Sequence, residues 1–398
     1  MSQDFTFPSP TRIAFGAGRI DKLGADLARL AEIGDASRVL VISDPGVADA
    51  GLTGRISAIL DSAGLDVALF TDIKSDPLAA SADGAAALAR SHDAQVVVGL
   101  GGGSAPDIAK LAAAIARAPE PAEHYALAAN PLPRGGLPLV LIPTTAGTGS
   151  EVTRTSVITS ADGRKLWAWG EPLRASLAIL DPTLTVALPP TLTAATGIDA
   201  VVHAIEACTG RRGNAMADAY GLHAIRLIAG NAGGAKSALT RALADPDDLD
   251  ARGEMMIAAA LAGIAFDVTG TAIAHAMGHA LGVLGGVHHG HAVGLCLNAA
   301  LAWNAEAAPA RHAAVARALG APCDGLDDEE AATLSYVAYG KLLRGSGLSL
   351  SLADKDIEAE ALAALTMAPE NAPMRDANCR EVTEQDALDI ARRVLSLA

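Results

Sequence analysis

The chain has 398 residues, of which 51% are hydrophobic, 19% are charged and only 3% are aromatic. This length exceeds what one hydrophobic core usually fills, so we expect two domains with aliphatic cores. The composition excludes a disordered chain, because disordered chains lack the apolar residues to form a core. Asp and Glu outnumber Lys and Arg by 45 to 30, and a formal net charge of −15 argues against a nucleic-acid partner.

The N-terminal residues and the cysteines favour a cytoplasmic protein. Met1–Pro8 has no basic stretch followed by an apolar stretch, so we expect no signal peptide. The cysteines at Cys208, Cys296, Cys323 and Cys379 are far apart and form no Cys-x-x-Cys pair. Scattered cysteines of this kind are typical of reduced, buried thiols, so we expect neither disulfides nor a structural zinc knuckle.

The first part of the chain alternates short β-branched runs with a helical pattern. Strands are expected at 38–42, 67–70, 94–100 and 137–142, and an amphipathic helix at 80–91. Strands that alternate with helices indicate an α/β domain with a parallel, Rossmann-like sheet covered by helices on both faces.

The second part shows helical patterns only. Beyond Pro189 no strand is expected, and Thr383–Asp386 has the form of a helix-capping start. Further helices are expected at 191–208, 214–229, 250–265, 271–284, 292–306 and 310–319. The sequence therefore divides into an α/β domain at 1–183 and an all-α domain at 184–398.

The stretch 255–287 carries a single formal charge, Asp267, and resembles a membrane span. Polar residues break it at Thr269–Thr271, and neither half reaches the roughly 20 apolar residues that a span requires. We therefore expect a buried helix pair and no membrane partner.

A glycine-rich loop follows the third expected strand. Gly101–Gly103 lead into a helix start at Ser104, where Ser104 or Asp107 would cap the helix. Glycines let a phosphate approach the backbone, and the helix N-terminus offers N–H donors to it. A tight turn without a ligand is the alternative.

A second loop follows the fourth expected strand and is rich in hydroxyl groups, with Thr144, Thr145 and Thr148. Loops at the carboxyl ends of two parallel strands face one crevice, where open α/β sheets bind ligands. Asp44, just after the first strand, is suited to the two hydroxyls of an adenosine ribose and would repel a 2′-phosphate. NAD is therefore preferred over NADP, although Asp44 could also be a simple turn residue before Pro45.

Histidines and one aspartate recur at helical spacing. Asp199 and His203 are four residues apart, as are His275 and His279, and His289 follows a glycine-rich break. Residues four apart share a helix face, so these side chains can surround one point. One carboxylate and several imidazoles suit Fe(II) or Zn(II), whereas buried core histidines without a metal are the alternative. No Glu follows His275, so the HExxH metallopeptidase motif is absent.

Taken in chain order, these motifs resemble the iron-containing (group III) alcohol dehydrogenases. The resemblance rests on the segments Phe15–Gly18, Gly101–Lys110, Pro143–Thr153, Asp181–Pro182, Thr196–Glu206, His275–His279 and His288–Gly290. It implies a fold like that of dehydroquinate synthase, with an NAD-binding domain and a helical metal-binding, catalytic domain. It also implies reversible hydride transfer between a small alcohol and NAD in the cleft between the domains, and a homodimer or higher homo-oligomer.

The resemblance also implies roles for individual residues. Asp199, His203, His275 and His289 would ligate one divalent metal, Fe(II) or Zn(II), and His279 would relay a proton beside the substrate. The implied NAD contacts are Asp44, Gly102, Gly103, Ser104, Asp107, Thr144, Thr145, Thr148, Thr153, Lys165 and Leu184.

Some assignments stay open at this level. The usual single histidine is doubled, and the 14-residue spacing from His275 favours His289 over His288. Glu206 either supports a ligand or lies on a solvated helix face. An exposed turn residue is the alternative for Lys165. Trp167, Trp169 and Arg174 either shape an anion-accepting pocket or pack at the surface.

The same architecture also serves other functions. A polyol dehydrogenase, a dehydroquinate-synthase-like lyase, and a reductase of a phosphorylated or sulfonated aldehyde are the alternatives to a small-alcohol dehydrogenase. A nucleotide sensor without catalysis is the alternative from another class.

Overall fold

The computed structural model describes residues 5–8, 10–30, 36–230 and 236–397, and their contacts form two compact units. The α/β unit comprises Ser9–Thr145 and Gly149–Val186. The helical unit comprises Met1–Pro8, Ala146–Thr148 and Ala187–Ala398. The main division falls close to the expected boundary at 183/184. The two short segments assigned to the helical unit carry no local pattern that would have placed them there.

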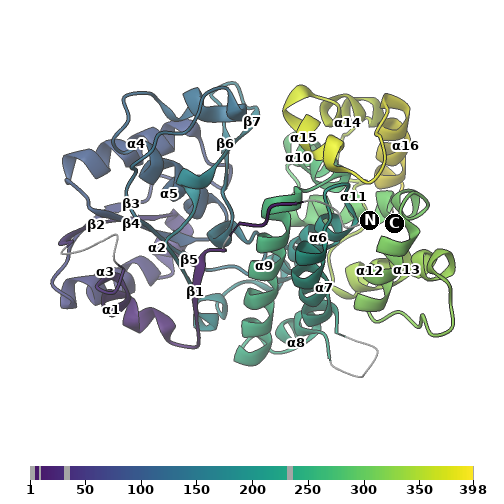
Figure 1. Ribbon diagram of the computed structural model, residues 1–398, viewed down its shortest axis with the longest axis horizontal. Helices are drawn as coiled ribbons and strands as arrows, with labels where there is room; N and C mark the ends of the chain where they lie inside the picture. The colour runs from purple at the N-terminus through teal and green to yellow at the C-terminus, as the bar shows by residue number, and fades with distance from the viewer. Residues whose placement is uncertain (1–4, 9, 31–35, 231–235, 398) are drawn as a thin grey trace. The chain divides into compact units, whose positions relative to one another are not determined.

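The α/β unit contains a six-stranded, wholly parallel sheet in the order β1-β8-β5-β4-β2-β3, part of which is visible in Figure 1. Its strands are β1 (Arg12–Phe15), β2 (Arg38–Ser43), β3 (Asp66–Phe70), β4 (Val96–Gly101), β5 (Leu139–Pro143) and β8 (Leu177–Leu180). All four expected strands are present within two residues of the expected ends, so the parallel sheet is confirmed.

Four strands were not expected from the sequence. β1 and β8 are only four residues long, which is too short for a clear apolar pattern, and β1 is largely exposed at the sheet edge. An antiparallel hairpin, β6 (Thr155–Thr159) and β7 (Lys165–Trp169), lies outside the main sheet. Its alternating burial is the pattern of a two-sided hairpin.

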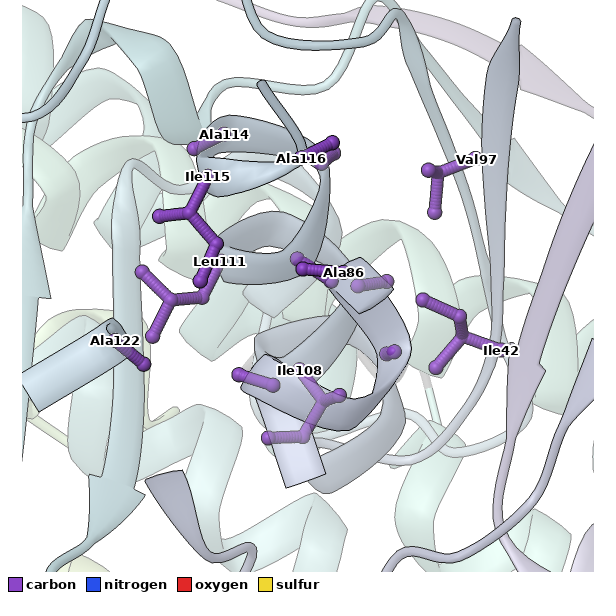
Figure 2. Close-up of a cluster of buried hydrophobic side chains, with 14 of the residues drawn as sticks. Ile42, Ala86, Val97, Ile108, Leu111, Ala114, Ile115, Ala116 and Ala122 are labelled. Atoms are coloured by element: carbon purple, nitrogen blue, oxygen red, sulfur yellow. The ribbon is translucent and has the colours of Figure 1, made fainter. Parts of the chain in front are cut away.

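The sheet buries both faces because successive side chains along each strand point to opposite sides. In β2, Leu40 and Ile42 belong to one core, whereas Val39 and Val41 belong to the other. Figure 2 shows the first core, where Ile108 and Leu111 of α5 lie among side chains from the strands and from α4. The helices of this unit are α1 (Leu23–Leu27), α2 (Pro45–Asp49), α3 (Leu52–Ser62), α4 (Ala79–Ser91) and α5 (Ser104–Ile115).

The helical unit is all-α over its described residues, as expected. Its helices are α6 (Pro190–Thr209), α7 (Ala215–Ala229), α8 (Ala238–Ala244), α9 (Leu249–Thr269), α10 (Ile273–Gly285), α11 (His289–Ala305), α12 (Pro309–Ala318), α13 (Asp328–Gly345), α14 (Ala359–Thr366), α15 (Ala372–Ala377) and α16 (Glu384–Leu395). Helices α6, α7 and α9 pack side by side, and α10 packs on α11 (Figure 1). One expectation was wrong, because α11 begins at His289 and not at residue 292, so His289 is a helical residue.

The apolar stretch that resembles a membrane span forms α9 and α10. Gly270 ends α9 with a positive φ of 80°, and the two helix axes are bent by 106° at this break. Most side chains of both helices are buried within the unit, as expected for a core helix pair. No single described helix meets the length and apolarity needed to cross a membrane, and α9 and α10 meet them only as a bent pair.

Candidate functional site

The order of the strands reverses between β2 and β4. From β2 the chain continues to β3 on one side, and from β4 it continues to β5 on the other. In open parallel sheets such a reversal leaves a crevice at the carboxyl ends of the two strands, where nucleotides bind. Asp44 follows β2, and the glycine loop follows β4, so both predicted cofactor elements lie at this point.

Asp44 and Gly101 approach each other closely there. The Oδ1 of Asp44 accepts a hydrogen bond from the backbone N–H of Val47 at 3.0 Å, so Asp44 is the N-cap of α2. Gly101 has a φ of 154°, and a Cβ atom placed on it would lie 2.9 Å from Asp44 Oδ2. Only glycine fits here. The capping role and the predicted ribose contact are compatible, because Oδ2 is not used by the cap.

The glycine loop and the hydroxyl-rich loop are neighbours, as expected. Gly101 pairs with Pro143 at the ends of β4 and β5, and the N–H of Thr144 donates to the carbonyl of Gly101 at 2.9 Å. A Cβ atom on Gly102 would lie 3.3 Å from Thr145 Cγ2. Neither Ser104 nor Asp107 caps α5, because the helix N-terminus has no side-chain acceptor. Its first N–H groups are therefore available to an anion.

Asp107 takes part in a buried network that the sequence did not indicate. Its Oδ1 accepts from Ser150 Oγ at 2.6 Å, its Oδ2 accepts from Val157 N at 3.0 Å, and Lys110 Nζ lies 3.6 Å away. Burial raises the pKa of Asp107, and the Lys110 charge opposes this effect. Lys110 is fully buried, and its presence between apolar positions of α5 was the available signal. Thr153, a predicted NAD contact, accepts from Lys110 Nζ at 3.0 Å.

The remaining predicted NAD contacts lie in different surroundings. Lys165 is the first residue of β7 and is ion-paired with Asp76, so it is a strand residue and not a turn residue. Leu184 is buried in the sheet core, 4% exposed. Thr148 belongs to the helical unit. A nucleotide role for these residues stays a prediction.

In the helical unit, three predicted ligands converge. Asp199 is buried on α6, His275 is buried on α10, and His289 opens α11. The Oδ1 of Asp199 lies 3.8 Å from His275 Nε2 and 3.6 Å from His289 Nε2. One ligand atom from each residue lies within 4.8 Å of the other two, which is the spacing of a single-ion site. His288 is exposed, so the structure brings His289 to the cluster, as its spacing indicated.

His203 and His279 flank this group of three. His203 shares the face of α6 with Asp199, its Nδ1 lies 3.8 Å from Asp199 Oδ1, and its ring stacks on His275 with centroids 4.4 Å apart. His279 lies one turn after His275 and is half-buried, with its ring centroid 5.3 Å from that of His289. His279 therefore lies beside the ligand cluster, and its role as a proton relay stays a prediction.

The cluster fits a divalent cation because its inward atoms have no other partner. Asp199 Oδ1, His203 Nδ1 and His275 Nε2 are buried and have no hydrogen-bond partner among the described residues. Burial raises the pKa of Asp199 to about 7 and holds the pKa of His203 well below its usual value. Unpaired buried polar groups are costly, and oxygen and imidazole nitrogen donors suit Fe(II) and Zn(II).

Glycines let the three helices approach closely enough for the ligands to meet. A Cβ atom on Gly290 of α11 would lie 2.2 Å from the carbonyl oxygen of Ala195 on α6. A Cβ atom on Gly278 of α10 would lie 2.5 Å from Val293 Cγ1 on α11. Sequence reasoning missed both, although each glycine is within three residues of a histidine of the cluster.

Comparison with known proteins agrees with this geometry. The family profile "Iron-containing alcohol dehydrogenase" matches residues 10–182, and "Fe-containing alcohol dehydrogenase family, C-terminal" matches residues 193–395. Long-chain-alcohol dehydrogenase 1 of Geobacillus thermodenitrificans is 35% identical over 362 residues, which are 90% of this chain and 88% of that protein.

Two solved structures extend the likeness to the fold. The crystal structure of a 1,3-propanediol oxidoreductase aligns with a TM-score of 0.89 and 31% identity, over 98% of this chain and 100% of that one. Sulfoacetaldehyde reductase from Bifidobacterium kashiwanohense, solved with NAD⁺, aligns with a TM-score of 0.86 and 30% identity, over 99% and 100%. This chain therefore belongs to the iron-containing alcohol dehydrogenases, enzymes that interconvert alcohols and carbonyl compounds with a nicotinamide cofactor.

Proposed function

We propose that this enzyme transfers a hydride reversibly between NAD and a small, uncharged alcohol, at a site where Asp199, His203, His275 and His289 hold one divalent cation. The observation that carries the proposal is the set of buried, partnerless ligand atoms on Asp199, His203 and His275. Iron is the first choice of cation and zinc the second, since the same nitrogen and oxygen donors serve both.

The side chains of the cluster have different roles in the proposed reaction. When bound, the cation supplies Lewis-acid polarisation of the substrate oxygen. Asp199 and the histidine ligands hold the cation in place and exclude water from the buried side of the site. His279, half-buried and outside the ligand group, accepts the alcohol proton and passes it to solvent, and in the reverse reaction it returns the proton.

The nucleotide lies at the strand reversal in the α/β unit. Gly102, Gly103 and Ser104 let the pyrophosphate approach the uncapped N-terminus of α5, whose N–H groups and dipole favour an anion. Thr144 and Thr145 contact the same phosphates or the adjoining ribose from the neighbouring loop. Asp44 selects NAD, because its carboxylate repels the 2′-phosphate of NADP.

The cations that could bind an anionic substrate are engaged in ion pairs, and this favours an uncharged substrate. Arg174 Nε donates to Glu171 at 3.0 Å, and Arg154 donates to the same carboxylate at 2.6 Å while it stacks on Trp169. Lys165 pairs with Asp76. Arg154 and Arg174 share one carboxylate and Lys165 has its own, so these cations are partly neutralised and offer less to an anionic substrate than unpaired ones would.

The test is reconstitution followed by a substrate panel. Metal-free protein is loaded anaerobically with Fe(II) or Zn(II), bound metal is counted, and NADH oxidation is followed with straight-chain aldehydes and their sulfonated and phosphorylated analogues. One ion per chain and turnover of uncharged aldehydes are expected. Equal turnover by metal-free and loaded protein would refute the metal assignment. Turnover confined to the sulfonated or phosphorylated aldehydes would replace the uncharged substrate with an anionic one.

We also propose a cytoplasmic homodimer. The edge strand β1 pairs only with β8 among the described strands, and its Ile13 and Phe15 are 39% and 47% exposed. Exposed apolar side chains on an open sheet edge favour pairing with a second copy. All four cysteines are free, as expected in a reducing compartment. Light scattering should give a dimer for the wild type and a monomer for Phe15→Lys. A monomeric wild type would exclude the proposed dimer.

A further inference from the structure

Glu206 is a buried acid beside the ligand cluster, and the sequence left its role open. It lies on α6, three residues after His203 and seven after Asp199, so all three share one helix face. Its side chain is buried, which excludes a solvated helix face. Its carboxylate points to the start of α10, the helix that carries His275.

The hydrogen bonds of this carboxylate to described residues go to the N-cap and first turn of α10. Oε2 accepts from the N–H of Ala272 at 2.8 Å and contacts His275 Nδ1 at 2.6 Å, and Oε1 accepts from the N–H of Ala274 at 2.7 Å. The first turn of α10 has no side-chain cap of its own. Glu206 therefore satisfies backbone donors that would otherwise be buried and unpaired, at the end of the helix where negative charge is favourable.

These contacts determine which ring nitrogen of His275 carries the hydrogen. Both carboxylate oxygens of Glu206 already accept from backbone N–H groups, so the short contact is an Nδ1–H donating to Oε2. The Nε2 of His275 then has a bare lone pair. This atom is the one that faces Asp199 Oδ1 at 3.8 Å and has no partner among the described residues.

We propose that Glu206 is a positioning residue that fixes the Nδ1–H tautomer of His275, presents its bare Nε2 to the cation, and anchors the first turn of α10. The inference rests on the proposed function, because it assigns Glu206 to that same cation site. The ring of His275 is thus held between two carboxylates of α6, Glu206 at Nδ1 and Asp199 at Nε2. Hydrogen-bond acceptors behind metal-binding histidines commonly contribute a factor of about 10–100 in metal affinity.

Glu206→Gln tests the tautomer with a side chain of the same shape. An amide N–H₂ turned toward His275 would donate to Nδ1 and favour a hydrogen on Nε2, where the cation belongs. In the full-length, metal-free protein we expect the dissociation constant for Zn²⁺, measured by competition with a chromophoric chelator, to rise by about 10–100-fold. An affinity equal to that of the wild type would overturn the proposal.

Asp248→Ala is the control for the loss of a helix cap, because alanine has no side-chain acceptor. Asp248 caps α9 by accepting from the N–H of Ala251 at 2.8 Å, and it lies outside the ligand cluster. Its loss should lower the unfolding temperature and leave the Zn²⁺ dissociation constant unchanged. A rise in that constant as large as the one for Glu206→Gln would show that any weakened helix cap disturbs the site, and would overturn the specific role of Glu206.

The wild-type protein gives a direct measurement of the His275 tautomer. In metal-free protein with ¹⁵N-labelled histidine, the ring resonances of His275 are assigned by their loss in His275→Ala. An Nδ1–H tautomer is expected, and an Nε2–H tautomer would overturn the proposal. If the wild type bound no divalent cation, the proposed function would fail, whereas the tautomer measurement would still decide the role of Glu206.

Discussion

Each unit of the chain buries a polar network, and the two networks differ in how complete they are. In the α/β unit, Lys110 Nζ is fully buried and donates to Ser150 Oγ at 2.7 Å, Thr153 Oγ1 at 3.0 Å and the carbonyl of Thr155 at 2.6 Å. All three amine hydrogens have acceptors, and Asp107 lies near enough to balance the charge. This network ties α5 to the start of β6 and needs nothing from outside the chain.

The network of the helical unit is incomplete. Three buried atoms, Asp199 Oδ1, His203 Nδ1 and His275 Nε2, have no hydrogen-bond partner among the described residues. Proteins seldom bury polar atoms in this way unless a ligand completes the set. The comparison separates two uses of a buried charge. The complete network supports the fold, and under the proposed function the incomplete one binds a cation. Changes to the first should alter stability, and changes to the second should alter catalysis.

The largest expected effect is the loss of turnover in His289→Ala. Its side chain is 40% exposed, so the free energy of unfolding of the metal-free protein should change by less than about 1 kcal/mol. Turnover should fall about 10³-fold or more, because Lewis-acid stabilisation is worth several kcal/mol. Steady-state kinetics and bound-metal analysis check this. His288→Ala, which removes the exposed neighbouring histidine, should behave as the wild type, and equal losses in both variants would contradict the ligand assignment.

Lys110→Met tests the complete network of the α/β unit. It removes a buried cation, so Asp107 loses its counterion and two hydroxyls lose a donor, which should lower the free energy of unfolding by about 3–5 kcal/mol in urea titrations. Bound metal per folded chain should stay at the wild-type value. Lys341→Met, at an exposed position on α13, should cost less than about 0.5 kcal/mol. A large loss of bound metal in Lys110→Met would break the distinction between the two networks.

Elements with a strong local pattern could be predicted from the sequence, and elements without one could not. Long apolar runs such as 38–42 and 94–100 predicted their strands, since a strand buried on both faces has a nearly continuous apolar pattern. Thr383 and Asp386 predicted the capping box of α16, because its hydrogen bonds are local. Strand β1 was missed because four mostly exposed residues carry too little pattern.

The candidate site shows the same limit. Helical spacing was enough to associate Asp199 with His203 and His275 with His279, but it could not show that two helices and the start of a third meet at one point. The hydrogen-bond acceptors of Lys110 are 40 or more residues away in the chain, and Glu206 contacts His275 across 69 residues. Contacts at such separations depend on the tertiary fold, so a single sequence does not reveal them.

The α/β unit also holds a buried carboxyl group that should make stability depend on pH. Burial raises the pKa of Glu151 to about 7, against an opposing contribution from Lys110. Between pH ~4.5 and ~7 the folded chain keeps a proton that the unfolded chain has lost, so the free energy of unfolding should fall as pH rises through this window. The fall is at most about 3.5 kcal/mol, since one pKa unit corresponds to about 1.4 kcal/mol.

Urea titrations of metal-free protein at several pH values measure this slope. Glu151→Gln keeps the neutral form at every pH and should reduce the slope, whereas Glu381→Gln, at an exposed position, should leave it unchanged. The same slope in Glu151→Gln and in the wild type would show that this acid ionises freely in the folded α/β unit.

The smallest expected effect concerns glycines, and it tests whether the incomplete network depends on close helix packing. In Gly290→Ala the new Cβ atom would meet the carbonyl oxygen of Ala195 at 2.2 Å, so α11 must move away from α6 and carry His289 with it. We expect a loss of about 1–3 kcal/mol in the free energy of unfolding, together with weaker Zn²⁺ binding. Gly54→Ala on α3, where a Cβ atom meets nothing within 4 Å, should instead gain up to about 1 kcal/mol and leave Zn²⁺ affinity unchanged. If Gly290→Ala lost stability but kept its Zn²⁺ affinity, the ligands would not depend on the α6–α11 contact, and the helices could shift without separating Asp199 from His289.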